Sequence, residues 1–337
     1  MAHPGQVRRK TSGWATRPCA LRHAARRGLS KAAAAGAASW LLRHRTSPTV
    51  RLWAPGGGSR VRAGPLTVRA LGVRRAATVL LHGITGTGEA FGAGYDTLAD
   101  DGRLIVPDVL GFGASLDPHR DDFSLPAHLD ALDAMATALD LDGVPLTVAG
   151  HSMGAVLALH WAARRPEVRR VLTFSAPLYR TTEEADRHIR AMGLLEGLFA
   201  LETPLARWTC AWMCEHRELA QWISVAISPQ WPIPLARLGV DHTWPAYLGG
   251  MNTIIRSPSW QDSMERLVDR GVPVWMVNGA RDPVPVPGLV DQLADEMPTI
   301  ETRTHAHAGH DLPITYAAWC ARLLAGTPGP GSTGRRG

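Results

Sequence analysis

Alternating strand-like and helix-like segments constrain the fold of this chain more than any other feature of its sequence. Short apolar runs bounded by Gly and Pro predict strands at 49–54, 66–70, 77–81, 104–107, 146–149, 171–174, 272–277 and 299–304. Amphipathic or Ala-rich segments between several of these runs predict helices at 125–139, 153–163, 286–297 and 316–324. Strands and helices in alternation form a parallel sheet with helices on both faces. We therefore predict an α/β fold with a mostly parallel eight-stranded sheet.

The alternation stops between residues 176 and 265. This segment has helix-like patterns rich in tryptophan, interrupted by prolines between 229 and 234, and no convincing strand. A helical insertion between two halves of one parallel sheet is expected to form a cap over an active site. We accordingly predict a core at 49–175 and 266–325, a helical cap at 176–265, and a disordered Gly- and Pro-rich tail at 326–337.

Charge is distributed unevenly along the chain. The formal net charge is +6, yet 16 of the 36 Lys and Arg residues lie in the first 76 residues, before the first acidic residue, Glu89. The remaining residues carry 20 basic and 30 acidic side chains, so the body of the protein is acidic. We expect residues 1–48 to be a disordered basic extension, of which residues 1 to about 45 are dispensable for folding and activity. Because this basic arm lacks hydrophobic periodicity and interleaved aromatic side chains, no nucleic-acid partner is expected.

The composition of the amino-terminal arm also bears on location. The expectation is a disordered extension, or translated sequence upstream of the true start, and a cytoplasmic location. An acid-free start that contains Arg and Ala is also typical of export signals and organelle transit peptides, and an exported or organellar location is the alternative. No apolar run reaches the roughly 18 residues that a membrane span requires, so stable membrane insertion is not expected. The sequence does not predict the oligomeric state.

The sharpest chemical signal is the pentapeptide 150–154, G-H-S-M-G. It follows the predicted strand 146–149 and precedes an Ala-rich helix, and this context distinguishes it from a chance G-x-S-x-G match. A serine on such a sharp turn is held in a strained conformation that flanking glycines permit, with its hydroxyl above the sheet and near the positive end of the helix dipole. Ser152 is therefore the candidate nucleophile.

A serine hydroxyl needs a neighbouring base and a group that orients that base. Asp282 lies just past the carboxyl end of the predicted strand 272–277, where residues that face a ligand are found in open α/β sheets. His310 lies in a short loop between the last predicted strand and the last helix. The chain order Ser152, Asp282, His310, each after a strand, predicts a nucleophile, an orienting acid and a base.

A loop after an earlier strand supplies candidate donors for a developing oxyanion. The segment 80–86, L-L-H-G-I-T-G, follows the strand 77–81. Its backbone N–H at Ile84 is expected to pair with the N–H of Met153.

Together these segments resemble the α/β-hydrolase superfamily, in its serine-dependent form with a helical cap. The resemblance covers about residues 49–325 and includes an aspartate followed by a Gly-rich turn at 108–115 and Pro313 after the histidine. It implies Ser152, Asp282 and His310 as the catalytic triad. An aspartate in place of Ser152 would have suggested a dehalogenase or an epoxide hydrolase.

The resemblance implies several possible reactions. The first expectation is a serine esterase that hydrolyses a carboxylic ester through an acyl-enzyme, acting on a small molecule with apolar bulk. The alternatives are a hydrolase of carbon-carbon bonds in diketones, an aminopeptidase, a haloperoxidase-like enzyme, and a non-catalytic binding relative. No metal or organic cofactor is expected, because the histidines and the four cysteines lack zinc-site spacing.

The predicted cap contributes the least specific candidates. Trp208 and Trp212 lie one helical turn apart, and either the core of the cap or a wall of the substrate site would account for them. His305 and His307 are read as loop histidines, and Cys210 and Cys214 as buried apolar side chains.

Overall fold

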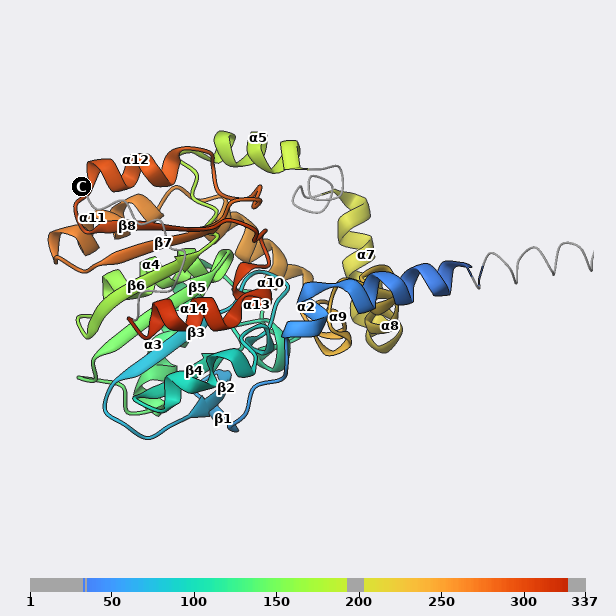
Figure 1. Ribbon diagram of the computed structural model, residues 1–337, viewed down its shortest axis with the longest axis horizontal. Helices are drawn as coiled ribbons and strands as arrows, with labels where there is room; N and C mark the ends of the chain where they lie inside the picture. Colours follow the sequence, from blue (N-terminus) through green and yellow to red (C-terminus); the bar gives the residue numbers. More distant parts are fainter. Residues whose placement is uncertain (1–32, 34, 193–202, 327–337) are drawn as a thin grey trace, which may run out of the picture.

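The computed structural model describes residues 33, 35–192 and 203–326. Its centre is a twisted sheet of eight strands in the order β1-β2-β4-β3-β5-β6-β7-β8 (Figure 1). The strands are β1 (Ser59–Ala63), β2 (Leu66–Leu71), β3 (Ala77–Leu81), β4 (Arg103–Pro107), β5 (Leu146–His151), β6 (Val168–Phe174), β7 (Val274–Gly279) and β8 (Ile300–His305). β2 is antiparallel to both of its neighbours, and the other pairs are parallel. The prediction of a mostly parallel eight-stranded sheet is confirmed.

Apolar side chains cover both faces of this sheet. On one face, Val79 and Leu81 of β3 pack in a core with α3 (Leu125–Ala138), α4 (Met153–Arg164), α11 (Trp260–Asp269) and α12 (Leu289–Glu296). On the other face, Leu80 packs with the 3-10 helix η2 (Ala93–Ala99) and α14 (Ala317–Leu324). Burial of alternate residues on both sides explains why the central strands appear in the sequence as continuous apolar runs.

Helices make up most of the described part of the inserted segment, and short turns connect them. Its helices are α5 (Thr182–Met192), α7 (Pro204–Glu215), α8 (Arg217–Ile227), α9 (Ile233–Leu238), α10 (Trp244–Gly249) and a π-helix, η4 (Gly250–Ile255). We call α7 to α10 the cap helices. Helix α11 crosses the predicted boundary at 265, and its buried Trp260, Met264 and Leu267 belong to the main core. The inserted helices thus include one that supports the sheet.

The first predicted strand, 49–54, is wrong. Residues Pro48–Leu52 form helix α2, which Ser47 caps by accepting a hydrogen bond from the Val50 N–H at 3.4 Å. A proline in the first turn, whose missing N–H has no partner to lose there, suits this helix. The strand that the prediction missed is β1, an edge strand whose first four residues are exposed. An edge strand with little buried surface leaves a weak hydrophobic pattern.

The predicted disorder of the basic extension is wrong for residues 35–46, which are helical (Figure 1). Alanine has the highest helix propensity, and residues 32–38 are alanine except for one glycine. Three side chains then form hydrogen bonds that join this segment to carbonyl oxygens in the last turn of helix α8 and just after it. The Trp40 indole donates to Val225 O at 3.1 Å, the His44 Nδ1 donates to Pro229 O at 3.0 Å, and the Ser47 hydroxyl donates to Gln230 O at 2.6 Å.

Residues 1–32 and 34 of the basic extension, and the tail 327–337, lie outside the described residues. The shorter helices that complete the described part are η1 (Gly88–Ala90), η3 (Gly113–Ser115) and α13 (Leu312–Thr315). No helix in this part is both long enough and apolar enough to cross a bilayer.

Candidate functional site

Ser152 stands on a tight turn between β5 and α4. Its backbone has φ 53° and ψ −122°, a region that a residue with a side chain rarely adopts. The flanking glycines are required by close approach: a Cβ on Gly150 would lie 1.9 Å from Gly154 O, and a Cβ on Gly154 would lie 2.2 Å from Leu81 O. The turn therefore aims the Ser152 side chain away from the core and keeps α4 tightly against β3.

Asp282 and His310 are hydrogen bonded. Both carboxylate oxygens of Asp282 lie within reach of the His310 Nδ1, at 3.1 and 3.2 Å, and one of them also accepts from the Val284 N–H at 2.9 Å. The Asp282 side chain has no exposed surface, whereas that of His310 is 35% exposed. Burial alone raises the pKa of the Asp282 carboxyl, but hydrogen bonds from His310 and from the Val284 amide bring that pKa below its ordinary value. An ionised Asp282 fixes the proton on Nδ1 and leaves Nε2 free to act as a base.

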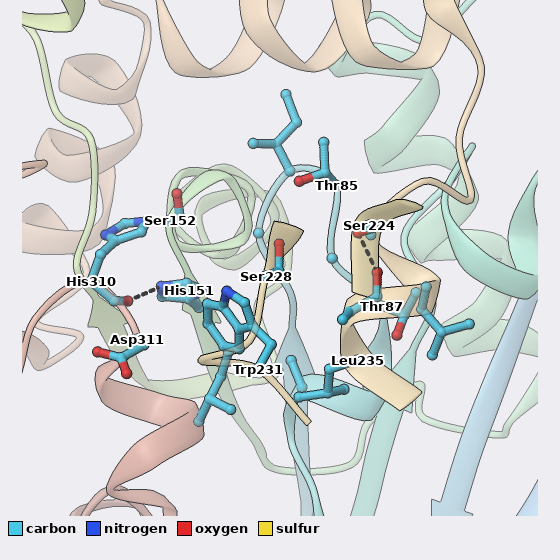
Figure 2. A pocket seen from close by; sticks show the side chains of 18 residues that line it. Thr85, Thr87, His151, Ser152, Ser224, Ser228, Trp231, Leu235, His310 and Asp311 are labelled. Carbon is cyan, nitrogen blue, oxygen red and sulfur yellow. Dashed lines mark hydrogen bonds between the residues drawn. The ribbon is translucent and has the colours of Figure 1, made fainter. Parts of the chain in front are cut away.

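Ser152 and His310 face a common cavity of about 490 Å³ (Figure 2). The loop 83–87 and Ile314 line it from the sheet side, while Ser224, Ser228, Trp231 and Leu235 line it from the cap side. Asp282 lies behind the His310 ring and does not line the cavity. The structure thus brings together three residues that are separated by up to 158 positions in the sequence.

Ile84 lies beside Ser152 in a tightly turned loop. A Cβ on Gly83 would be 3.1 Å from the Ser152 Cβ, so this loop passes directly over the serine. The Gly86 N–H donates to Gly83 O at 3.0 Å, and Thr85 between them has φ 56°. Ile84 itself lines the cavity. Ile84 therefore borders the same cavity as Ser152.

Met153 is the first residue of α4, and its N–H has no acceptor within the helix, as is general for the first turn. This residue and Ile84 belong to two different elements next to Ser152, and the pairing of their amides as an oxyanion hole stays a prediction.

His82 holds the Ile84 loop in place. Its ring is fully buried, donates from Nδ1 to Gly83 O at 2.8 Å, and accepts at Nε2 from the Val109 N–H at 2.8 Å. Burial lowers the pKa of His82, so the ring is neutral and this donor and acceptor pattern persists at neutral pH. The imidazole ties the loop after β3 to the loop after β4.

His151 supports His310 from behind. Its Nε2 donates to the backbone oxygen of His310 at 2.7 Å, and the two rings lie 4.7 Å apart. Burial lowers the pKa of His151 to about 3, so its ring stays uncharged beside the base. This hydrogen bond joins the Ser152 turn to the loop that carries His310.

The tryptophans predicted for the substrate wall do not reach the cavity. The Trp208 side chain is 64% exposed, and Trp212 stacks on His216 with ring centroids 5.0 Å apart. Trp231 lines the cavity instead, together with Leu235 at the start of α9. The sequence interpretation missed them because a short turn between prolines has no periodicity from which an inward face can be identified.

The histidine pair His305 and His307 lies outside the cavity, whose lining carries few charged side chains. His305 packs against Tyr316 with ring centroids 4.0 Å apart, and the described ranges contain no group of three or more His, Cys, Asp or Glu side chains that could hold a metal ion. Neither Lys nor Arg is present among the described residues that line the cavity, and the one carboxylate there is Asp311. Asp311 accepts hydrogen bonds from the hydroxyls of Thr49, at 3.0 Å, and of Thr315.

Comparison with known proteins shows which family and which relatives this chain is similar to. A family model described as the alpha/beta hydrolase family matches residues 78–323. The chain is 26% identical over 231 residues to a probable lysophospholipase, BODYGUARD 4, of Arabidopsis thaliana, covering 64% of this chain and 54% of that protein. It is 36% identical over 103 residues to a 2-hydroxy-6-oxo-2,4-heptadienoate hydrolase of Pseudomonas putida, covering 29% and 36% of the two chains. The matches thus span about half or less of these relatives.

The solved structures agree in fold. The crystal structure of a bromoperoxidase from Bacillus anthracis superposes with a TM-score of 0.60 at 15% identity, covering 79% of this chain and 98% of that one. At this identity the likeness concerns the fold alone. The family model covers most of the chain and includes both the Ser152 turn and the His310 loop, and the chain therefore belongs to the alpha/beta hydrolase family of enzymes.

Proposed function

We propose that this enzyme hydrolyses carboxylic esters through an acyl-enzyme formed on Ser152. The observation that carries the proposal is the pairing of a strained serine at a cavity with a histidine whose Nδ1 is held by a buried, ionised aspartate. A serine hydroxyl without such a base is a poor nucleophile at neutral pH. The same arrangement would have no structural use in a binding module.

Each residue has one part in the proposed reaction. The Ser152 oxygen attacks the carbonyl carbon and its proton passes to Nε2 of His310, while the N–H groups of Ile84 and Met153 bind the resulting oxyanion. The intermediate collapses, and His310 returns the proton to the leaving alcohol. Water then attacks the acyl-enzyme with His310 again as the base, which releases the acid and restores the Ser152 hydroxyl. Asp282 remains ionised throughout.

The lining of the cavity supports an uncharged, apolar substrate. Ile84, Trp231, Leu235 and Ile314 provide apolar surface, and the described lining offers no cation to an anionic substrate. A negatively charged ligand would instead face Asp311. The likeness to a probable lysophospholipase, an enzyme named for a lipid ester, agrees with the preference for an apolar acyl chain.

Hydrolysis of a carbon-carbon bond is the second candidate. It is favoured by the likeness to the heptadienoate hydrolase of Pseudomonas putida. A dienoate is an anion, however, and the absence of Lys and Arg from the described cavity lining argues against it. We therefore rank the ester first.

A direct test combines labelling with a substrate panel. A serine-directed phosphonate should add one equivalent to wild-type protein at Ser152, located by peptide mass spectrometry, and none to Ser152→Ala. Purified enzyme should cleave p-nitrophenyl esters of short or medium acyl chains, with a burst of p-nitrophenol where deacylation is slow. Labelling without ester cleavage, together with turnover of a vinylogous diketone, would replace the ester with the carbon-carbon reaction.

A further inference from the structure

Large apolar side chains are exposed at one end of this molecule and almost nowhere else in its described residues. Twelve such side chains are exposed among the described residues, and ten of them lie on the helix 35–46, on α2, or on the segment that runs from α7 to α9. Figure 1 shows these elements side by side, at the end away from the sheet, and the bonds from Trp40 and His44 to the carboxyl end of α8 join them. We call the exposed side chains at this end the apolar surface; its members include Leu41, Leu42, Trp208, Trp222, Ile223 and Ile227.

The pattern on α8 is the reverse of that on an ordinary surface helix. Leu219, Ile223 and Ile227 recur every four residues and therefore share one face, and all three are exposed. The buried positions of the same helix are the smaller Ala220 and Val225. Burial of larger side chains inside the protein is the norm, so this outward stripe is available for a contact beyond the residues that the structure describes.

Charge indicates what that contact is. The cap helices α7 and α8 carry two arginines and two glutamates between them and are balanced. The neighbouring amino-terminal segment is not, because it contributes exposed Arg43, Arg45 and Arg51 and belongs to a stretch of 76 residues with 16 basic and no acidic side chains. Exposed Leu, Ile and Trp beside arginines is the composition of helices that lie in the interface of an anionic membrane.

We propose that the apolar surface and the adjoining arginines dock this enzyme on the surface of an anionic lipid bilayer, without spanning it. A second copy of the chain is a poorer occupant. A two-fold dimer through this patch would place Arg43 and Arg45 of both copies against the same basic surface, and like charges would oppose it.

The docking surface is one helix away from the active-site cavity. Ile223 and Ile227 face outward from α8, while Ser224 and Ser228 of the same segment line the cavity at Ser152. A second hollow of about 360 Å³ lies below the amino-terminal helix and shares Trp231 and Asp311 with that cavity. Docking would bring the cavity next to apolar molecules held in the bilayer, although docking itself does not depend on the ester chemistry.

The test is sedimentation of the full-length protein with vesicles of phosphatidylcholine alone or with about a third phosphatidylserine. Wild type should bind the anionic vesicles, and more weakly as salt is raised. Ile223→Gln with Ile227→Gln, and separately Arg43→Gln with Arg45→Gln, should each lower the vesicle partition coefficient about tenfold. Ser152→Ala should bind as wild type does, so the outcome is independent of the proposed reaction.

Matched controls come from the loop between β2 and β3, which is not part of the apolar surface. Val73→Gln removes a side chain that is 94% exposed, and Arg74→Gln with Arg75→Gln removes two exposed arginines. Neither control should change binding, and thermal unfolding should confirm that all variants are folded. The proposal is overturned if wild type ignores both kinds of vesicle, or if controls and test variants lose binding equally. It is also overturned if sedimentation velocity shows a stable dimer that Ile223→Gln with Ile227→Gln dissociates, since the surface would then serve self-association.

Discussion

The two sides of the active-site cavity are built in different ways. On the sheet side, Ser152, His82 and the Asp282 side chain are buried, and each forms a hydrogen bond at the end of a strand or in the loop that follows one. On the cap side, Trp231 and Leu235 are carried by a turn and a six-residue helix, and the neighbouring helix α8 exposes its larger side chains. From this difference we expect the sheet side to govern the proposed chemistry, while the cap side, with less of its surface buried, governs which substrate can enter. The predictions below test this division.

The largest effect is expected at the nucleophile. Ser152→Ala should lower kcat for an ester on the order of 10³-fold or more, because the oxyanion donors remain but no covalent intermediate can form. Assays of ester hydrolysis with purified protein measure the loss of kcat, and an unchanged unfolding temperature shows that the fold persists. Ser228→Ala, on the cap side of the same cavity, should keep most of the activity. Equal losses for the two serines would contradict the division.

The next effect concerns a buried histidine of the sheet side. His128 on α3 is 1% exposed, and neither of its ring nitrogens has a partner among the described residues. Burial lowers the pKa of His128 to about 3. Below about pH 6.5, His128 therefore binds a proton in the unfolded chain but not in the folded chain. The folded state has its full stability at neutral pH, and the free energy of unfolding decreases as the pH falls from 6.5 towards 3.

Urea unfolding at pH 7 and pH 4 measures this loss. Between pH 6.5 and pH 4, the unfolding free energy of wild type should fall by about 3 kcal/mol more than that of His128→Leu. The exposed His119→Gln serves as the control and should leave the pH dependence as it is. A wild-type chain and a His128→Leu chain with parallel pH profiles would show that the ring is solvated or paired in solution.

A smaller effect is expected from the amino-terminal helix. A chain that starts at residue 34 keeps the bonds of Trp40, His44 and Ser47 to the carboxyl end of α8, whereas one that starts at residue 48 loses all three. Because each bond contributes roughly 1 kcal/mol to holding the cap side, the shorter chain should lose about tenfold in kcat/KM. Hydrogen exchange at residues 225–230 should rise in parallel. If the two chains were equally active, the sequence-based expectation that this segment is dispensable would stand after all.

The smallest effect is expected within the cap itself. Trp231→Ala should lower kcat/KM about fivefold for the longest acyl chain accepted and less for acetate esters, since it removes apolar wall without touching the reacting atoms. Trp208→Ala, which alters an exposed tryptophan away from the cavity, should change neither value. A larger loss for Trp208 than for Trp231 would mean that the cap closes differently around substrate.

Much of the sheet side could be predicted because its signals are local. Glycines at 150 and 154 are demanded by contacts of 1.9 and 2.2 Å at the Ser152 turn, and the strand before it is a continuous apolar run because both faces of the sheet are covered. Asp282 and His310 likewise follow strands, so strand order alone places them at one edge. These features are determined by the sequence within a few residues of each position.

Only the tertiary structure decided which residues complete the site. The sequence predicts a disordered arm where the helix 35–46 forms, because the bonding partners of this segment, the carbonyls of 225, 229 and 230, lie more than 180 positions away. The role of His151 depends on the backbone oxygen of His310, and the choice of Trp231 over Trp208 depends on how short cap helices turn. Propensity and periodicity describe a segment and its own neighbours, whereas these contacts arise from packing between segments that are distant in the chain.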